Sequence, residues 1–161
     1  MSTPSVVLAA AEGRTPAPLN VVGEETLVKF APEDCDGQMA VFHLVAPPMS
    51  GPPLHVHTRE DEFFHVLEGE LVFEVDGVQH TVGVGGSVGL RRGVPHRYQN
   101  FTAHDARLLI VTSPGAFCGF FKDISAITPA GGLPTMEQLL SLDAAYGLTT
   151  LGPPLQQVQA G

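Results

Sequence analysis

Three histidines and one glutamate are spaced along the middle of the chain in a pattern that suits metal binding. His55 and His57 are two residues apart, so on a β-strand both side chains leave the same face and converge on one point. Glu62 follows five residues after His57, and His96 comes directly after a Gly-Val-Pro turn signal. Three neutral imidazoles and one carboxylate suit divalent first-row metals and leave positions open for a ligand. On spacing alone, the alternative is that the His-x-His pair is a chance match on a surface loop.

The segments that must position these residues have the pattern of short β-strands. The 18 glycines and 14 prolines recur between short apolar runs, a spacing of turn signals typical of a sandwich or barrel of strands. We expect strands at 25–30, 39–45, 54–57, 62–67, 71–75, 78–82, 87–90, 96–101 and 107–112. Closure of these strands into a barrel would bring the three histidines and the glutamate together.

Turn and cap residues refine this pattern. Tight hairpins are expected at Gly69 and at Asp76-Gly77, since a type I′ turn needs positive φ at both central residues, which Asp tolerates and Gly accepts freely. Two helices are expected after the strands, over 117–127 and 135–146. A threonine at the start of the second helix, a glutamine three residues later and a glycine after its end are its expected capping residues.

Length and composition predict one domain spanning residues 1–161, with a barrel core over about 25–112 and a helical tail over about 117–147. A chain of 161 residues that is 43% apolar can bury a core without disulfides. Cys35 and Cys118 form no Cys-x-x-Cys pair, so we expect free thiols in a reducing compartment. The Pro-, Gly-, Ala- and Gln-rich segments 1–18 and 148–161 are expected to form arms or loose ends.

The charge balance excludes several classes of partner. With 17 acidic residues against 8 basic ones, the net charge of −9 repels polyphosphate backbones and anionic membrane surfaces, so we expect no nucleic-acid and no membrane partner. No apolar stretch is long enough to cross a bilayer, and the N-terminus lacks the basic and apolar regions of a signal peptide. We therefore expect a cytoplasmic protein.

Two longer stretches resemble the motifs of a known superfamily. The first, from Gly51, contains Pro-Leu-His-Val-His-Thr-Arg-Glu-Asp-Glu-Phe-Phe-His-Val-Leu-Glu-Gly and resembles the first motif of the cupins. The second, from Gly85 to Asn100, resembles the second cupin motif, although Arg91 stands where a proline is usual and Gly51 is two residues closer to His55 than is usual. The resemblance implies an all-β fold, an antiparallel cupin (double-stranded β-helix or jelly-roll) barrel with short C-terminal helices.

The resemblance also implies a metal and an activity. The combined motifs and the tail look like bacterial single-domain cupins of the quercetinase type, in which a metal binds a flavonol and dioxygen and the ring is cleaved with release of carbon monoxide. It implies one divalent transition metal per chain (Ni, Mn, Fe, Co, Cu or Zn), bound by His55, His57, Glu62 and His96. Glu62 would also be the catalytic base that takes the flavonol hydroxyl proton. The expected function is a dioxygenase that cleaves a flavonol-like or other enolisable phenolic substrate.

Two other function classes stay open. One is a metal-dependent isomerase or epimerase of a sugar or hydroxy acid, which the apolar predicted lumen disfavours. The other is a non-catalytic binder of a small ligand, although no helix-turn-helix segment accompanies the barrel as in a cupin regulator. The expected partners are a small, aromatic substrate and a second copy of the chain. The homodimer follows from the family resemblance and from apolar N-terminal strands that can pair with a neighbouring sheet edge.

Strand parity indicates which further side chains share a face with the expected ligands. Phe64 shares its strand face with Glu62, and Tyr98 shares its face with His96, so both are candidates for the substrate pocket, although core packing is the default role of such rings. His43 is a third candidate, because hydrophobicity does not distinguish the two faces of its strand.

Charged residues near the motifs have simpler expected roles. Glu60 and Asp61 are expected in the turn before the strand of Glu62, where amide replacements should have little effect. The arginines of the second motif are expected either to form a ring of solvated charges at the rim or to anchor an acidic substrate. They are Arg91, Arg92 and Arg97.

Overall fold

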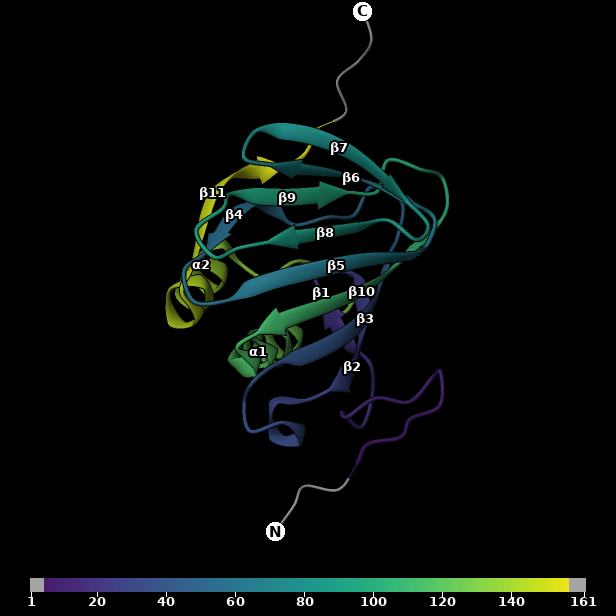
Figure 1. The fold of residues 1–161 in the computed structure, drawn as a ribbon. Helices are drawn as coiled ribbons and strands as arrows, with labels where there is room; N and C mark the ends of the chain where they lie inside the picture. Colours follow the sequence, from purple (N-terminus) through teal and green to yellow (C-terminus); the bar gives the residue numbers. More distant parts are fainter. Residues whose placement is uncertain (1–4, 157–161) are drawn as a thin grey trace, which may run out of the picture.

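The computed structural model describes residues 5–156 as two facing antiparallel sheets with two helices beside them (Figure 1). The six-stranded sheet has the order β1-β2-β3-β10-β5-β8 and the five-stranded sheet the order β11-β4-β9-β6-β7. The elements are β1 (Leu19–Val21), β2 (Glu24–Phe30), β3 (Ala40–Ala46), β4 (Pro53–His57), β5 (Asp61–Glu68), β6 (Glu70–Val75), β7 (Val78–Gly83), β8 (Ser87–Leu90), β9 (His96–Gln99), β10 (Ala106–Ser113), α1 (Cys118–Ile127), α2 (Met136–Tyr146) and β11 (Leu148–Pro154). The expected jelly-roll fold is present, as two facing sheets and not as a closed barrel.

The core lies between the two sheets. Along β3 the buried residues alternate with more exposed ones, and Phe42 and Leu44 are at most 1% exposed. The facing sheet contributes Leu71 and Phe73 of β6, which are also at most 1% exposed. This period-two alternation places one face of each strand in the core, as expected for packed antiparallel sheets.

All nine expected strands are present, with ends that differ by at most two residues from the prediction. The hairpin at Asp76-Gly77 is confirmed, with φ values of 49° and 78° between β6 and β7. The hairpin expected at Gly69 is wrong, because β5 and β6 belong to different sheets and do not pair. The turn at Gly69 carries the chain from one sheet to the other.

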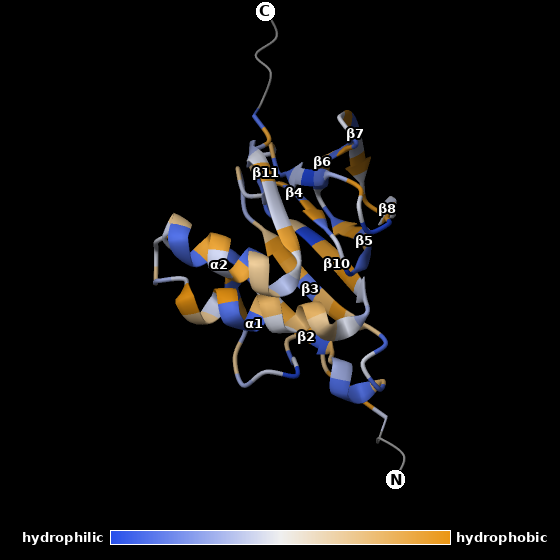
Figure 2. Cartoon of the chain, turned by 90° about the vertical axis from the view of Figure 1, so that its left-hand side faces the viewer, coloured by the Kyte–Doolittle hydropathy of each residue, from blue (hydrophilic) through white to orange (hydrophobic). Residues whose placement is uncertain are grey.

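The two expected helices are confirmed, and each begins one residue later than predicted. Thr135 caps α2: its hydroxyl accepts a bond from the Gln138 backbone N–H at 3.2 Å, and the Gln138 side chain accepts from the Thr135 N–H at 2.9 Å. Gly147 ends α2 in the left-handed conformation. The helices lie side by side (Figure 2), and α1 packs on β3 with the ring centroids of Phe121 and Phe42 4.4 Å apart.

The C-terminal segment differs from the prediction of a loose end. Residues Leu148–Pro154 form β11, which pairs with β4 and places Leu148 opposite His57 and Thr150 opposite His55. The physical reason is that β4 would otherwise be an unprotected sheet edge, which a neighbouring strand covers. The tail therefore supports the strand that carries two of the expected metal ligands.

The N-terminal arm, in its described part 5–18, contains no helix or strand before β1 (Leu19–Val21), in agreement with the prediction of an arm. The Lys29 ammonium contacts this arm and donates to the carbonyls of Ala9, Ala10 and Glu12 at 3.2, 2.7 and 2.6 Å. Residues 1–4 and 157–161, also expected to be loose ends, lie outside the described residues.

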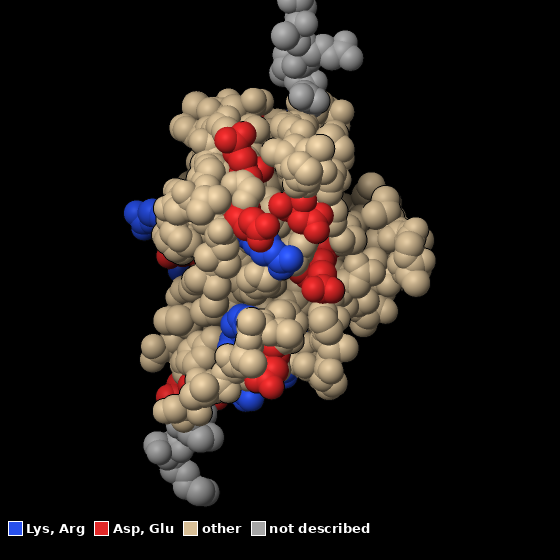
Figure 3. Space-filling model, turned by 90° about the vertical axis from the view of Figure 1, so that its right-hand side faces the viewer, with Lys and Arg blue, Asp and Glu red and all other residues tan. Residues whose placement is uncertain are grey.

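Surface features complete the description. On the face seen in Figure 3, acidic and basic side chains stand close to one another and much of the surface carries no charge. Cys35 and Cys118 are free thiols, as expected. Neither helix of the described segment 5–156 is long and apolar enough to span a membrane.

Candidate metal centre

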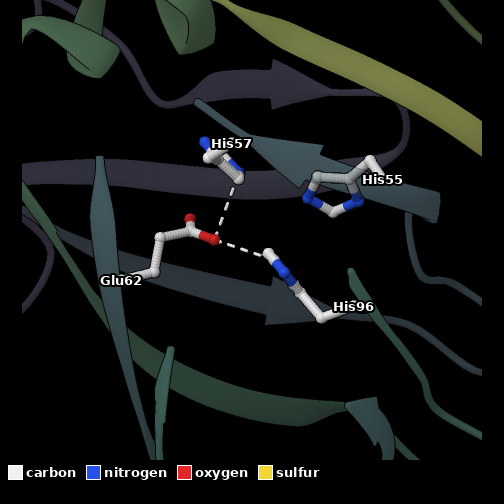
Figure 4. Close-up of side chains that lie close together, drawn as sticks. All are labelled: His55, His57, Glu62 and His96. Atoms are coloured by element: carbon white, nitrogen blue, oxygen red, sulfur yellow. Dashed lines mark ion pairs between the residues drawn. The ribbon is translucent and has the colours of Figure 1, made fainter. Parts of the chain in front are cut away.

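The four expected ligands come together in the interior, from both sheets (Figure 4). On the five-stranded sheet, β4 carries His55 and His57, and His96 of β9 stands directly opposite His55. Glu62 reaches them from β5 of the facing sheet. One potential ligand atom from each residue lies within 4.8 Å of the others, and Glu62 Oε2 is 3.1 Å from His57 Nε2 and 2.9 Å from His96 Nε2.

The second nitrogen of each imidazole is held by an acceptor. Nδ1 lies 2.8 Å from the Pro53 carbonyl in His55 and 2.9 Å from the Val94 carbonyl in His96. A carbonyl oxygen only accepts, so Nδ1 carries a proton in both rings, and in the neutral imidazole Nε2 then keeps its lone pair. Such outer contacts fix the ring orientation and the tautomer of metal-binding histidines.

Two ligand atoms are buried without a hydrogen-bond partner, Oε2 of Glu62 and Nε2 of His96. Glu62 is 7% exposed and His96 is 3% exposed, so water does not compensate them freely. An unpaired buried polar atom costs about 1–3 kcal/mol. A divalent cation between these atoms would satisfy both, so the donor set fits a metal ion.

The pKa shifts of the metal-free cluster also favour a bound cation. Burial lowers the pKa of His57, but the carboxylates of Glu62 and Glu60 outweigh that effect and raise the pKa to about 9. Burial raises the pKa of Glu62, but the imidazoles of His57 and His96 hold it far below its usual value. Burial, with the nearby His96, lowers the pKa of His55 to about 4. The cluster is therefore built around one positive charge beside a carboxylate, which a metal ion can replace with release of a proton.

Glu60 has a role that the sequence reasoning missed. It is only 3% exposed, and its Oε2 lies 3.4 Å from Nδ1 of His57, the ring nitrogen that does not face Glu62. Asp61, by contrast, is half-exposed and pairs with Arg92 at 3.1 Å. The expectation that amide replacements at Glu60 and Asp61 have little effect stays a prediction, and the burial and contact of Glu60 argue against it at that position. The available signal was its position three residues after a ligand histidine in a short loop.

The loop between β4 and β5 is held by the C-terminal end of α2. The Thr58 backbone N–H and hydroxyl donate to the Gly147 carbonyl at 3.0 and 2.8 Å, and the Arg59 guanidinium donates to the Ala145 carbonyl at 3.0 Å. The Phe117 ring, just before α1, meets the His57 ring edge-on at a centroid distance of 4.5 Å. The C-terminal segment that contains α1 and α2 thus packs against the candidate metal centre on the side of His57.

The pocket candidates occupy different places. Phe64 and Tyr98 face the interior as expected and are each 4% exposed, but they pack against Phe73 as part of the core. His43 lies on the other face of β3 from Phe42, so its expected place in the pocket is corrected. Both faces of β3 are apolar, which is why its sequence gave no preference.

A buried carboxylate away from the metal centre was not expected from the sequence. Glu24 of β2 is 6% exposed, and it accepts hydrogen bonds from the Tyr98 hydroxyl at 2.8 Å and the Ser50 hydroxyl at 2.9 Å. Burial raises the pKa of Glu24 to about 7, although these two hydrogen bonds lower it. Residues from three separate segments make this cluster, and no local motif marks it.

With the geometry described, comparison with known proteins assigns the fold. Residues 42–112 match the family described as the cupin domain. The chain has a cupin fold. No curated protein matches the sequence. Among solved structures, a predicted oxalate decarboxylase from Thermotoga maritima is 25% identical, with 68% of this chain and 99% of that chain covered and a TM-score of 0.60.

Two further cupin neighbours have different activities. A sugar phosphate isomerase from Silicibacter pomeroyi is 24% identical, with 63% of this chain and 69% of that chain covered and a TM-score of 0.51. The polyketide cyclase RemF from Streptomyces resistomycificus is 24% identical, with 56% and 64% covered and a TM-score of 0.50. These likenesses support the cupin fold and do not single out a quercetinase, because one fold carries many activities.

Proposed function

We propose that this cupin binds one divalent transition metal per chain through His55, His57, Glu62 and His96, and uses it as an enzyme. The observation that carries the proposal is the arrangement of lone pairs. Two imidazoles have Nδ1 fixed by backbone carbonyls, and the buried Nε2 of His96 and Oε2 of Glu62 have no other partner. A shell of three imidazoles and one carboxylate leaves room for exogenous ligands on a five- or six-coordinate ion.

The activity we propose is a dioxygenase that cleaves a flavonol-like or other enolisable phenolic substrate. Two of the three arginines of the second motif are engaged in ion pairs, since Arg97 bonds Glu74 at 2.8 Å and Arg92 bonds Asp61 at 3.1 Å, and Arg91 is exposed at the surface. A sugar phosphate or dicarboxylate would need unpaired cations to offset its charge. The rings of Phe117 and Phe64 belong to the core and lie beside the imidazoles of His57 and His96, so the surroundings of the centre are apolar and suit a phenolic ring better.

The protein's own residues have distinct roles in this reaction. The ion, when bound, would supply the positive charge that acidifies a phenol or enol hydroxyl. Glu62, the carboxylate of the cluster, accepts the hydroxyl proton and leaves an electron-rich enolate for dioxygen. The Pro53 and Val94 carbonyls keep His55 and His96 oriented with their Nε2 lone pairs free. For a flavonol, the product gains both oxygen atoms of dioxygen and loses one carbon as carbon monoxide.

The test is aerobic incubation of protein loaded separately with nickel, cobalt, manganese, iron or copper with a panel of flavonols and other enolisable phenols. We expect oxygen uptake with at least one pair of metal and substrate, and none with metal-free protein or with His55→Ala/His57→Ala. Absence of uptake with every phenol, together with isomerisation of a sugar phosphate by the same samples, would replace the dioxygenase with the isomerase.

Glu62→Gln separates the two roles of Glu62. If Glu62 is the base, turnover should collapse even in protein reloaded to a full equivalent of metal, because an amide does not accept the proton. If Glu62 is only a ligand, turnover should fall in proportion to the metal lost. Full activity of metal-replete Glu62→Gln would remove the base role and leave the metal site intact.

A further inference from the structure

Thr112 stands beside Glu62 in the interior of the six-stranded sheet. In the register of β10, Thr112 lies opposite Glu62 of β5 on one side and opposite Ala40 of β3 on the other. Glu62 in turn lies opposite Leu90 of β8. Directly opposite residues of antiparallel strands share one face of the sheet, with Cβ atoms about 4.5–5.5 Å apart. Thr112 is 0% exposed, so its side chain faces the interior next to the carboxylate ligand.

The hydroxyl of Thr112 has no hydrogen-bond partner among the described residues. Of its two register neighbours, Ala40 has no polar side-chain atom, and the carboxylate of Glu62 forms no hydrogen bond with the hydroxyl. Thr26, which is equally buried on the inner face of β2, donates instead to the Glu24 carbonyl at 3.3 Å. The buried Thr128 hydroxyl donates to the Ile124 carbonyl at 2.7 Å. Thr112 is therefore unlike these other buried threonines.

Of the five buried side-chain N and O atoms without a partner in the described residues, three belong to Glu62, His96 and Thr112, at or beside the metal centre, and the other two belong to Arg97 and Gln99. A valine of nearly the same shape would avoid the cost of an unpaired hydroxyl. A buried polar group without a partner in the protein can be satisfied by a bound ligand, ion or water.

We propose that the Thr112 hydroxyl donates a hydrogen bond to a small anionic or oxygen-bearing ligand that binds beside Glu62 at the metal centre. The inference rests on the proposed metal site. The atoms that would hold the metal, the imidazole Nε2 lone pairs and the carboxylate oxygen, are all electron donors and offer no hydrogen to such a ligand. Thr112 supplies the donor on the Glu62 side and is a positioning residue for the bound ligand.

The test uses cobalt-loaded protein with azide as the small anionic probe, titrated by visible absorption. We expect Thr112→Val to keep one equivalent of cobalt and to raise the azide Kd about threefold to tenfold, the effect of one lost hydrogen bond. Thr112→Ser, which retains the hydroxyl, should restore the affinity to within about twofold. Thr26→Val is the matched control, and its azide Kd should equal that of the wild type.

Thermal unfolding of the metal-free proteins gives a readout independent of the metal. Thr112→Val should melt at the same temperature as the wild type or higher, because it loses no bond, whereas Thr26→Val should melt lower. An unchanged azide Kd in Thr112→Val would overturn the inference, as would a fall in its melting temperature as large as that of Thr26→Val. If Thr112→Val does not fold, Thr112→Ala and Thr112→Ser are compared in the same titration, and equal azide Kd values would overturn the inference.

Failure of the two proposals can be told apart. A wild-type protein that takes up no cobalt would overturn the metal site and this inference with it. Full cobalt uptake with an azide Kd that does not depend on the hydroxyl of residue 112 would overturn this inference alone.

Discussion

Two buried glutamates, Glu62 and Glu24, lie in different parts of the interior and have opposite electrostatics. They are 7% and 6% exposed, so burial alone does not distinguish them. The pKa of Glu62 is held far below its usual value by His57 and His96, although burial opposes this. The pKa of Glu24 is raised by burial to about 7, although the neutral hydroxyls of Tyr98 and Ser50 oppose this. The partner groups therefore decide which buried carboxylate keeps its charge.

The comparison separates a functional site from a structural one. Glu62 is charged, and its Oε2 lies 3.1 Å from Nε2 of His57 and 2.9 Å from Nε2 of His96, so a cation bound among these atoms would take the place of the proton that they share. Glu24 has one hydroxyl donor for each oxygen, and these bonds connect β2 of the six-stranded sheet to β9 and to the segment before β4. We interpret the Glu24 cluster as a tie between the two sheets.

The largest expected effect is on bound metal, which substitutions in the histidine cluster should release and a substitution in the Glu24 cluster should not. His55→Ala/His57→Ala should reduce bound metal from about one equivalent to below about 0.1 after gel filtration, since only a His-Glu pair remains. Glu24→Gln is the control and should keep the full equivalent. Elemental analysis measures both, and circular dichroism should show the sheets intact in each. A full equivalent in the double variant would contradict the ligand assignment.

The next effect concerns the pH dependence of stability at Glu24. Its pKa is about 7 in the folded protein and about 4.3 when unfolded, so the folded state binds the proton more tightly. The resulting stabilisation is fully present below about pH 4.3 and is lost as the pH rises through about 7. Between pH 4.5 and 8 the metal-free wild type should lose about 3 kcal/mol relative to Glu24→Gln.

Urea unfolding of the two metal-free proteins over this pH range measures that difference. Taking the difference removes contributions that the two proteins share, such as those of the histidine cluster. A difference that stays constant from pH 4.5 to 8, or that grows in favour of the wild type, would show that Glu24 is not protonated preferentially in the folded state.

A smaller effect distinguishes two neighbouring carboxylates at the metal centre. Glu60→Gln should weaken metal binding about tenfold, because the charge behind Nδ1 of His57 orients that ligand and strengthens it. Asp61→Asn is the matched control, since Asp61 pairs with Arg92 at the surface, and its affinity should change by less than about twofold. Competition with a chromophoric chelator gives both constants. Equal affinities in the two variants would mean that Glu60 is only a buried neighbour.

Local features of the fold could be predicted from the sequence, and long-range ones could not. The Asp76-Gly77 turn, the Thr135 cap and the shared face of His55 and His57 depend on residues a few positions apart, where conformational preferences act directly. The change of sheet at Gly69 depends on which strands pair across the molecule. Periodicity within one segment does not contain that information.

The buried residues of the interior also divide into those that could be predicted from the sequence and those that could not. The four expected ligands were predicted from their residue types together with the resemblance of the surrounding motifs to cupins, whereas Glu24 accepts a hydrogen bond from Tyr98 across 74 positions of sequence. Strand β11 could not be predicted either, because its Pro and Gly content indicates a loop while the free edge of β4 favours a paired strand.

The smallest expected effect is that of Tyr98→Phe, which removes one hydrogen-bond donor from Glu24 and leaves the metal centre unchanged. At pH 5 Glu24 is largely protonated, and loss of this bond should cost less than about 1 kcal/mol. At pH 8 Glu24 is largely ionised, and the Tyr98 hydrogen bond stabilises the ionised form, so the cost should be larger. In the Glu24→Gln background the pH dependence of this cost should disappear, because an amide does not ionise. Urea unfolding of the four metal-free proteins at both pH values completes the double-mutant cycle. A cost for Tyr98→Phe that is the same at pH 5 and pH 8 would mean that its ring, and not its hydrogen bond to Glu24, accounts for its role in the interior.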